Sequence, residues 1–307
     1  MNKKSKNIPI IVDLDGTLIY TDVLVESLIS CFKSNTVKFL KSIFVLLTHG
    51  KAAFKKIISE ISDINIDNLP YNTELIQWLI DQRENGRYIV LCTGSDYRYA
   101  KKIADHLEIF DEVHASDGVR NLVGSAKANF LSNKFAENNF DYIGNSENDI
   151  PVWKVSRNII LANCSSSCIN KIKTIKNPEI IFYKEKIRFS TFTSAIRVHQ
   201  WLKNLLLFTP MVASHMIFEI EAWTKTLTAF IAFSGYASAI YILNDLLDLD
   251  NDRAHPRKKE RPFASGRLPI HYGFVIMPIL IVFSSWIGFL LGNEFMLWLM
   301  SYLVLTT

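Results

Sequence analysis

The sequence shows no visible secretory signal, no metal-binding cysteine pattern and no strong charge of either sign. The N-terminal MNKKSKN runs directly into a strand-like IPIIVD without the long apolar region of a secretory signal, so we expect the N-terminal part in the cytosol. The four cysteines do not supply two ligand pairs, which favours buried free thiols over a metal site: Cys31, Cys92, Cys164 and Cys168. A formal net charge of +4 gives no signature of nucleic-acid binding, and we expect no nucleic-acid partner.

Long uncharged runs are absent from the first 187 residues and present behind them. No residue is charged from Thr226 to Leu243 or from Tyr272 to Asn293, and each run is long enough to cross a hydrocarbon core of about 30 Å as a helix. We therefore predict a soluble front domain (residues 1–187) and a transmembrane rear domain (residues 188–307), with the boundary near Lys184–Ser190. This organisation predicts a protein integral to the cytoplasmic membrane, with its front domain in the cytosol.

The front domain alternates strand-like and helical segments. Four apolar runs look like buried parallel strands: Ile8–Val12, Tyr88–Cys92, Tyr142–Gly144 and Asn158–Ala162. Helical patterns separate them, for example at Ala100–Leu107 and Ala126–Phe135. The alternation predicts a doubly wound, Rossmann-like α/β fold, in which ligands bind beyond the carboxyl ends of the strands.

Polar side chains cluster at those predicted strand ends. Four motifs carry them: VDLDGTL with Asp13 and Asp15, CTGSD with Thr93, GSAKANF with Lys127, and GNSENDIP with Asn145 and Asp149. Such a set suits phosphoryl transfer. One carboxylate attacks phosphorus and a second protonates the leaving oxygen, while a hydroxyl and an ammonium hold the phosphoryl oxygens and a further carboxylate helps to hold Mg²⁺.

With these motifs, residues 8–163 resemble the haloacid dehalogenase superfamily. The resemblance implies that Asp13 is the nucleophile and Asp15 the acid/base. It also implies that Thr93 and Lys127 bind phosphate, and that Asp13, Asp149 and the Asp15 backbone carbonyl hold Mg²⁺.

One position departs from the superfamily pattern. Asn145 stands where many members carry a second acidic residue, and a neutral amide is a weaker Mg²⁺ ligand than a carboxylate. A catalytically idle domain that is kept for structure is therefore an alternative to a phosphatase.

Residues 20–85 look helical throughout, at the place where this superfamily inserts a cap over the site. Within this cap, NTVKFLKSIFVLLTHGKAAFKKII mixes large apolar residues with five lysines: Lys38, Lys41, Lys51, Lys55 and Lys56. A basic amphipathic face of this kind is able to lie on an anionic membrane surface. The alternative is a cap helix that packs on its neighbour and leaves its lysines in solvent.

The densest charge of the rear domain lies between its two uncharged runs, in NDLLDLDND. On one continuous helix, four of its residues fall on one face: Asn244, Asp245, Asp248 and Asp252. Such carboxylates repel one another unless a divalent cation lies among them, which predicts a Mg²⁺ site.

A basic segment with Arg253, Lys258 and Arg261 follows and offers fixed positive charge to phosphate oxygens. An ordinary loop with cytosolic positive charge would explain these basic residues but not the helical spacing of the aspartates. Metal and basic residues beside a lipid core indicate ionisation or displacement of a pyrophosphate next to a membrane lipid.

The pattern NDxxDxxxD followed by DRxHPxKxxRP resembles the UbiA superfamily of intramembrane prenyltransferases, and RVHQWLKNLLLFTP resembles its first transmembrane helix. The branch most similar is related to decaprenyl-phosphate phosphoribosyltransferase, which transfers 5-phosphoribose from phosphoribosyl pyrophosphate to a polyprenyl phosphate. The resemblance implies Mg²⁺ bound by Asn244, Asp245, Asp248 and Asp252. It also implies phosphate contacts from five residues: Arg197, Lys203, Asn204, Lys258 and Arg261.

Enzymes of that superfamily use a second aspartate-rich segment and about nine helices, whereas this chain shows three or four apolar segments and ends at SYLVLTT. We therefore expect a partial, C-terminally truncated all-α bundle. The leading hypothesis is a bifunctional membrane enzyme of polyprenyl lipid metabolism that needs Mg²⁺ and acts on phosphoribosyl pyrophosphate or another phosphate ester. The alternatives are a prenyltransferase for an aromatic acceptor with an unrelated phosphatase domain, and a membrane-anchored regulatory module without catalysis.

Overall fold

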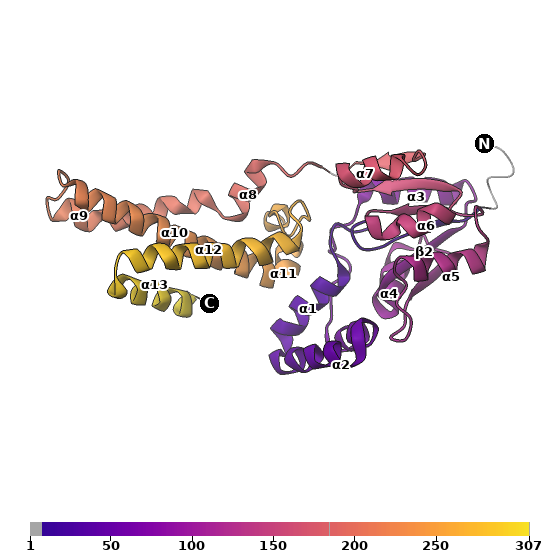
Figure 1. The fold of residues 1–307 in the computed structure, drawn as a ribbon, viewed down its shortest axis with the longest axis horizontal. Helices are drawn as coiled ribbons and strands as arrows, with labels where there is room; N and C mark the ends of the chain where they lie inside the picture. Colours follow the sequence, from indigo (N-terminus) through magenta and orange to yellow (C-terminus); the bar gives the residue numbers. More distant parts are fainter. Residues whose placement is uncertain (1–7, 184, 307) are drawn as a thin grey trace. The chain divides into compact units, whose positions relative to one another are not determined.

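The computed structural model describes residues 8–183 and 185–306, which form two compact units (Figure 1). The units are Met1–Lys186 and Ile187–Thr307, and the names front domain and rear domain are kept for them. The MNKKSKN segment, Lys184 of the expected boundary and the final Thr307 lie outside the described residues.

The front domain is built on a six-stranded sheet with the order β3-β2-β1-β4-β5-β6, and every neighbouring pair is parallel. The strands are β1 (Ile10–Val12), β2 (Ile89–Asp96), β3 (Glu112–Ser116), β4 (Asp141–Gly144), β5 (Asn158–Ala162) and β6 (Ile180–Phe182). This sheet confirms the predicted α/β fold class. The apolar runs did not predict β3, which is only half buried over most of its length, or β6, which has three residues.

Helices on both faces explain why the central strands are apolar at every position. Alternate residues of a strand point to opposite faces, so Ile10 and Val12 enter one core while Ile11 enters the other. On the first face lie α3 (Thr73–Glu84) and α4 (Tyr97–Leu107). The second face is covered by α5 (Ser125–Phe135), α6 (Ile150–Val155) and α7 (Ser166–Lys173). The four cysteines are buried free thiols, as expected.

The strand order reverses around β1, which lies between β2 and β4. In an open parallel sheet, such a reversal opens a crevice beyond the carboxyl ends of the strands concerned. Asp13 directly follows β1, Thr93 lies in the last half of β2 and Asn145 directly follows β4. The topology therefore brings the predicted site residues to one edge of the sheet.

The cap is smaller than the sequence pattern predicted. It consists of α1 (Val23–Ser34) and α2 (Thr36–Ile61), and α2 is broken at Gly50, whose φ of 80° is left-handed. The third helix of the predicted region, α3, buries Leu75 and Leu79 in the main core beside the sheet. It thus belongs to the layer that covers the sheet, because its apolar stripe has no other surface to bury against.

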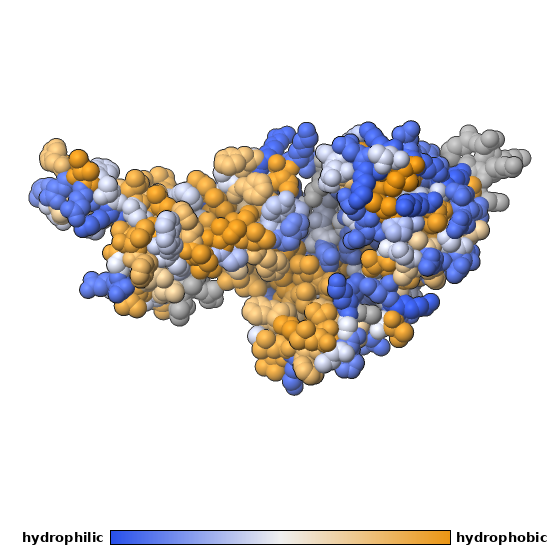
Figure 2. All heavy atoms as spheres, viewed as in Figure 1, coloured by the Kyte–Doolittle hydropathy of each residue, from blue (hydrophilic) through white to orange (hydrophobic). Residues whose placement is uncertain are grey.

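The rear domain is all-helical, as predicted. Its elements are α8 (Phe189–Ala195), the 3₁₀ segment η3 (Val198–Phe208), α9 (Thr209–Ala213), α10 (Ile220–Leu247), α11 (Leu249–Ala254), η4 (Lys258–Glu260), α12 (Ile270–Leu290) and α13 (Asn293–Thr306). By length and composition, α10 and α12 are able to cross a membrane, with 28 and 21 residues. Figure 2 shows a largely apolar surface over these helices.

Small residues bring α10 and α12 together. A Cβ atom on Gly235 of α10 would lie 2.1 Å from the Ser284 hydroxyl of α12, so the two backbones approach at a position where only glycine fits without a shift. Close approach through small residues is the usual way in which membrane helices associate.

The segment expected as a first transmembrane helix is instead the 11-residue η3. It is held along α10 by hydrogen bonds from Trp201 Nε1 to Ser238 Oγ and from Asn204 Nδ2 to Ser234 Oγ, both 2.9 Å long. Its polar side chains are thus used as donors to α10.

Candidate functional site

The first candidate site lies at the carboxyl edge of the front-domain sheet and centres on a buried lysine. Lys127 stands in the first turn of α5, and its Nζ donates to Asp13 Oδ1 at 2.7 Å. The same Nζ lies 3.8 Å from Asp149 Oδ1. Asp149 ends the short η2 (Glu147–Asp149) that follows β4. Residues that are more than 100 positions apart in sequence therefore share one buried charge cluster.

Tyr142 of β4 completes this cluster and was not predicted as a site residue. Its hydroxyl accepts a hydrogen bond from Lys127 at 2.9 Å and donates one to Asp149 Oδ1 at 2.7 Å. Burial alone lowers the pKa of Lys127, but the two carboxylates outweigh it and hold that pKa above its usual range. Lys127 therefore stays a cation, placed where an incoming phosphate would need one.

Asp149 also organises the loop after β4. Its Oδ2 accepts the backbone N–H groups of Asn145 and Ser146 at 3.1 and 3.2 Å. The Asn145 side chain lies against Gly16. A Cβ atom added to that glycine would lie only 2.1 Å from Asn145 Nδ2. With its left-handed φ of 73°, Gly16 leaves room for the Asn145 side chain beside the DLDGTL loop.

Asp15 is placed for proton transfer. Its Oδ1 accepts the Val23 N–H at 2.8 Å and its Oδ2 accepts the hydroxyl of Ser95. Burial, reinforced by the charge of Asp22, raises the pKa of Asp15 to about 7. Burial likewise raises the pKa of Asp13 to about 6, although Lys127 opposes that shift. Asp15 can therefore give and take a proton near neutral pH.

Thr93 is fully buried, and its hydroxyl accepts the backbone N–H of Ser95 at 3.0 Å. This bond ties Thr93 to the residue that contacts Asp15. Sequence reasoning missed Ser95, although a hydroxyl two residues beyond Thr93 in CTGSD was a usable signal.

The donor atoms at this edge fit a weakly held Mg²⁺. Lys127 contacts Oδ1 of Asp13, and the second carboxylate oxygen of Asp13, the Asp15 carbonyl and the Asn145 amide oxygen are further hard donors. Asp149 is already engaged by Tyr142 and the loop amides, and residues 8–183 and 185–306 gather no group of three His, Cys, Asp or Glu ligands. Mg²⁺ usually keeps several waters and needs one or two carboxylates, so this donor set is sufficient for a largely hydrated ion.

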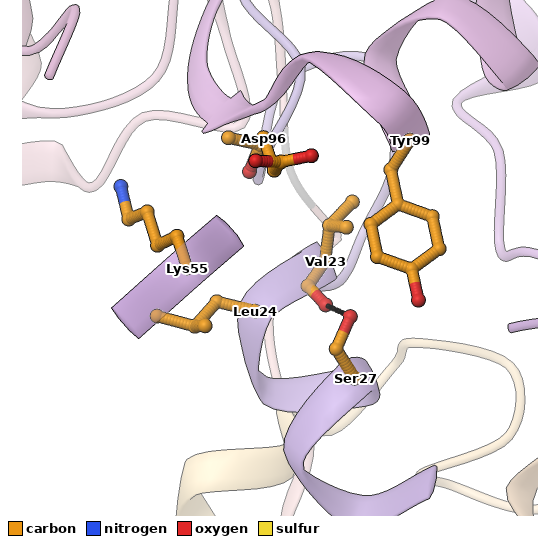
Figure 3. A pocket seen from close by; sticks show the side chains of 7 residues that line it. Val23, Leu24, Ser27, Lys55, Asp96 and Tyr99 are labelled. Atoms are coloured by element: carbon orange, nitrogen blue, oxygen red, sulfur yellow. Dashed lines mark hydrogen bonds between the residues drawn. The ribbon is translucent and has the colours of Figure 1, made fainter. Parts of the chain in front are cut away.

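The cap contributes a lysine beside this site. Lys55 of α2 donates to the Gly94 carbonyl at 2.6 Å and to Asn121 Oδ1 at 3.2 Å. Figure 3 shows the small pocket that it lines together with residues of α1 and α4. Its other lining residues are Val23, Leu24, Ser27, Ser95, Asp96 and Tyr99. Burial lowers the pKa of Lys55, and the charges of Asp15 and Asp22 oppose that shift.

The second candidate site is a cluster of charges in the rear domain. Asp245 in α10 and Asp252 in α11 are both buried. Arg261 bridges them, donating to Asp245 Oδ1 at 3.1 Å and to Asp252 Oδ2 at 2.6 Å. Arg197 also donates to Asp245, and Lys258 Nζ lies 3.9 Å from Asp252. Five of the predicted residues are thus brought together.

The remaining predicted residues of the rear domain are Asn244, Asp248, Lys203 and Asn204. Asn244 is exposed, and Asp248 stands at the junction where α10 ends and α11 begins, so the motif does not occupy one continuous helix. Lys203 is exposed. Asn204 binds Ser234, eleven residues before Asp245 and therefore about 16 Å away along α10.

The rear cluster does not fit Mg²⁺ as it stands. Its two buried carboxylates are neutralised by guanidinium groups, and the described part of the chain holds no group of three acidic or histidine ligands. Asp245 and Asp252 thus serve as partners of arginine in this arrangement. Two arginines in a partly buried position remain suited to an anionic group such as a phosphate.

The front domain is an α/β domain with a six-stranded parallel sheet and a buried cluster of Asp13, Lys127 and Asp149 at its carboxyl edge. In the rear domain, residues 206–307 match the UbiA prenyltransferase family. The chain thus combines an α/β domain with a C-terminal region that matches the UbiA prenyltransferase family.

Two relatives and one solved structure illustrate these likenesses. Protein y4nM of Sinorhizobium fredii is 32% identical over 302 residues, which are 98% of this chain and 58% of that protein. Decaprenyl-phosphate phosphoribosyltransferase of Corynebacterium glutamicum is 40% identical over 98 residues, 31% of this chain and 30% of that enzyme. The chain thus spans little more than half of the first relative and less than a third of the second.

The solved structure is a haloacid dehalogenase-like family protein, SP0104 of Streptococcus pneumoniae. It is 15% identical with a TM-score of 0.41 and covers 58% of this chain and 95% of that one.

The bridge made by Arg261 yields a stability prediction. Arg261→Leu leaves the buried Asp245 and Asp252 with fewer compensating charges, which should lower the free energy of unfolding by on the order of 2 kcal/mol. Thermal unfolding of the detergent-solubilised protein measures the effect. Arg267→Leu is the matched control, since Arg267 is exposed and its substitution should change stability by no more than about 0.5 kcal/mol. Equal melting temperatures for the two variants would contradict the bridging role.

Proposed function

We propose that the front domain is a phosphatase with Asp13 as its nucleophile, and that the rear domain transfers phosphoribosyl groups to a polyprenyl phosphate. The observation that supports the first part is the buried Lys127, whose Nζ donates to Asp13 Oδ1 at 2.7 Å and places a cation beside the proposed nucleophile. The second part is supported by the UbiA match and by the likeness to the Corynebacterium glutamicum phosphoribosyltransferase.

In the proposed reaction, Asp13 Oδ2 attacks the phosphorus of a phosphate ester and the ester oxygen leaves with the proton of Asp15. Lys127 and Thr93 hold the phosphoryl oxygens during this displacement. The ionised Asp15 then takes a proton from water, which attacks the aspartyl phosphate and releases inorganic phosphate and a free Asp13 carboxylate. Mg²⁺, held by Asp13, the Asp15 carbonyl and Asn145, would supply further positive charge for the phosphoryl oxygens.

The rear cluster supports an anionic substrate at the membrane. Arg197 and Arg261 present guanidinium groups close to the end of α10, a helix long enough to cross a bilayer. A pyrophosphate leaving group needs such positive charge as it departs. A polyprenyl-phosphoryl pentose phosphate made there would be a phosphate ester confined to the membrane, and it is the substrate that we propose for the front domain.

The nucleophile can be tested directly. The protein should hydrolyse an aryl phosphate in the presence of Mg²⁺, and Asp13→Asn should lower kcat by on the order of 10³-fold or more, because an amide cannot form the acyl phosphate. Asp105→Asn, which removes an exposed carboxylate from a surface pair, should leave the rate unchanged. Activity that survives Asp13→Asn removes Asp13 from this role. No activity in any variant, across many phosphate esters, would instead favour a front domain that is catalytically idle.

The pH dependence of kcat/KM tests the separate roles proposed for the carboxyl groups of Asp13 and Asp15. Asp13 must be ionised to attack, so kcat/KM should rise as pH passes about 6. Asp15 must be protonated to donate its proton, so kcat/KM should fall as pH passes about 7. The Ser95 hydrogen bond opposes the rise that burial causes in the pKa of Asp15. Ser95→Ala should therefore move the falling limb to higher pH, whereas Ser167→Ala, an exposed serine, should not. A falling limb that stays in place contradicts the contact.

The lipid products test the coupling of the two domains. Given phosphoribosyl pyrophosphate and polyprenyl phosphate, the full-length protein encoded by the gene should yield polyprenyl-phosphoryl ribose without the 5-phosphate. Asp13→Asn should stop at the phosphorylated lipid. Arg197→Gln, which removes one of the two guanidinium groups proposed to hold the anionic substrate, should strongly reduce any lipid product. Mass spectrometry of the extracted lipids decides, and identical lipid profiles for the parent and Asp13→Asn would refute the coupling.

A further inference from the structure

The outward face of the first half of α2 is apolar, and no described residue covers it. Four large side chains on this face are strongly exposed: Val37 at 64%, Leu40 at 61%, Phe44 at 66% and Leu47 at 79%. Figure 2 shows an apolar protrusion at the position of α1 and α2 in Figure 1. These four side chains are called the cap face. Spacings of three, four and seven residues place them on one side of the helix.

The cap does not need this face for its own folding. The opposite side of α2 carries Phe39 and Leu46, which pack with Cys31, Phe54 and Ile58 in a separate small core. The first half of α2 is therefore apolar on both sides. A helix of this kind is normally covered on both sides, by protein or by lipid.

The positive charge around the cap face favours anionic lipid as the surface that covers it. From Ser27 to Ser59 the chain has no aspartate or glutamate and six lysines: Lys33, Lys38, Lys41, Lys51, Lys55 and Lys56. Lys38, Lys41 and Lys51 are exposed along or just beyond the same helix half. Lysines can bury their alkyl stems along apolar surface and keep their ammonium groups at the level of the headgroups. Anionic lipid attracts such lysines.

We propose that the cap face docks on the surface of a bilayer that contains anionic lipid, with α2 lying among the headgroups and its four large side chains inserted. A bilayer is the occupant to which this chain has constant access, because α10 and α12 are of membrane length. Tethering makes docking intramolecular, so weak interfacial affinity is enough. Docking does not depend on catalysis by Asp13.

The break at Gly50 separates this role from the role of the second half of α2. Residues 36–49 carry the cap face, and residues 51–61 carry Lys55, which reaches the Gly94 carbonyl beside the Asp15 and Ser95 contact. The two halves of α2 thus connect the cap face to the Gly94 carbonyl, which forms the rim of the front site. A docked cap would hold that rim at the headgroup level, where a phosphate on a lipid lies.

The test places a fluorescent label on the cap face. The native cysteines are buried, so Leu47→Cys gives one accessible thiol, and Val119→Cys, at a position 89% exposed outside the cap, gives the matched control. The labelled full chain is reconstituted in vesicles of phosphatidylcholine with or without phosphatidylglycerol, together with a lipid that carries an acyl-chain quencher. The label at position 47 should be quenched, more strongly with phosphatidylglycerol, and the label at position 119 should not be quenched.

Charge reversal then tests the lysines. Lys38→Glu with Lys41→Glu should lower the ratio of docked to undocked cap by roughly tenfold or more on vesicles with phosphatidylglycerol. The melting temperature should not change, because both residues are exposed. The proposal is overturned if position 47 is not quenched or if positions 47 and 119 are quenched equally. It is also overturned if labels at position 47 exchange energy between copies in every lipid and in detergent, which would show that a second copy covers the face.

Discussion

The buried ammonium of Lys127 is the interaction on which the front site depends. An isolated charge in this position would be very costly, and Asp13 and Asp149 compensate it, with Tyr142 as a third partner. Asp13 is far in sequence from Tyr142 and Asp149, and the pairing of β1 with β4 in the sheet brings them together. The same ion cluster therefore stabilises the junction of β1, β4 and α5 and aims one oxygen of the proposed nucleophile.

The rear domain also contains buried charges that need compensation, and arginines supply it there. Its buried carboxylates, Asp245 and Asp252, are compensated by arginines from segments before α10 and after α11. Arg261 contacts both carboxylates through one nitrogen of its guanidinium group, and Arg197 donates to Asp245 as well. In both domains a cation from a distant segment holds a pair of acidic residues, so a bound phosphate would enter a site whose charges are already arranged.

Much of the front domain followed from local pattern. Continuous apolar runs indicated the central strands because helices bury both faces of a parallel sheet. The pattern missed β3, and it assigned α3 to the cap. A short half-buried strand has no continuous run, and a helical stripe does not reveal which surface it will bury against. Tyr142 was missed for a similar reason, since a residue that lies within a strand gives no sign that its hydroxyl faces a site.

The sequence by itself determined the order of the motifs, the α/β class of the front domain, the two membrane-length runs and the excess of lysine in the cap. These depend on residue type and local spacing, which the chain carries before it folds. Only the tertiary structure decided which charges meet. The acidic motif of the rear domain breaks at Asp248 and pairs with arginines, and Asp149 is taken up by Tyr142 and loop amides. The physical reason is that a buried carboxylate takes the donor that the fold brings nearest, and residue spacing along the chain does not specify that donor.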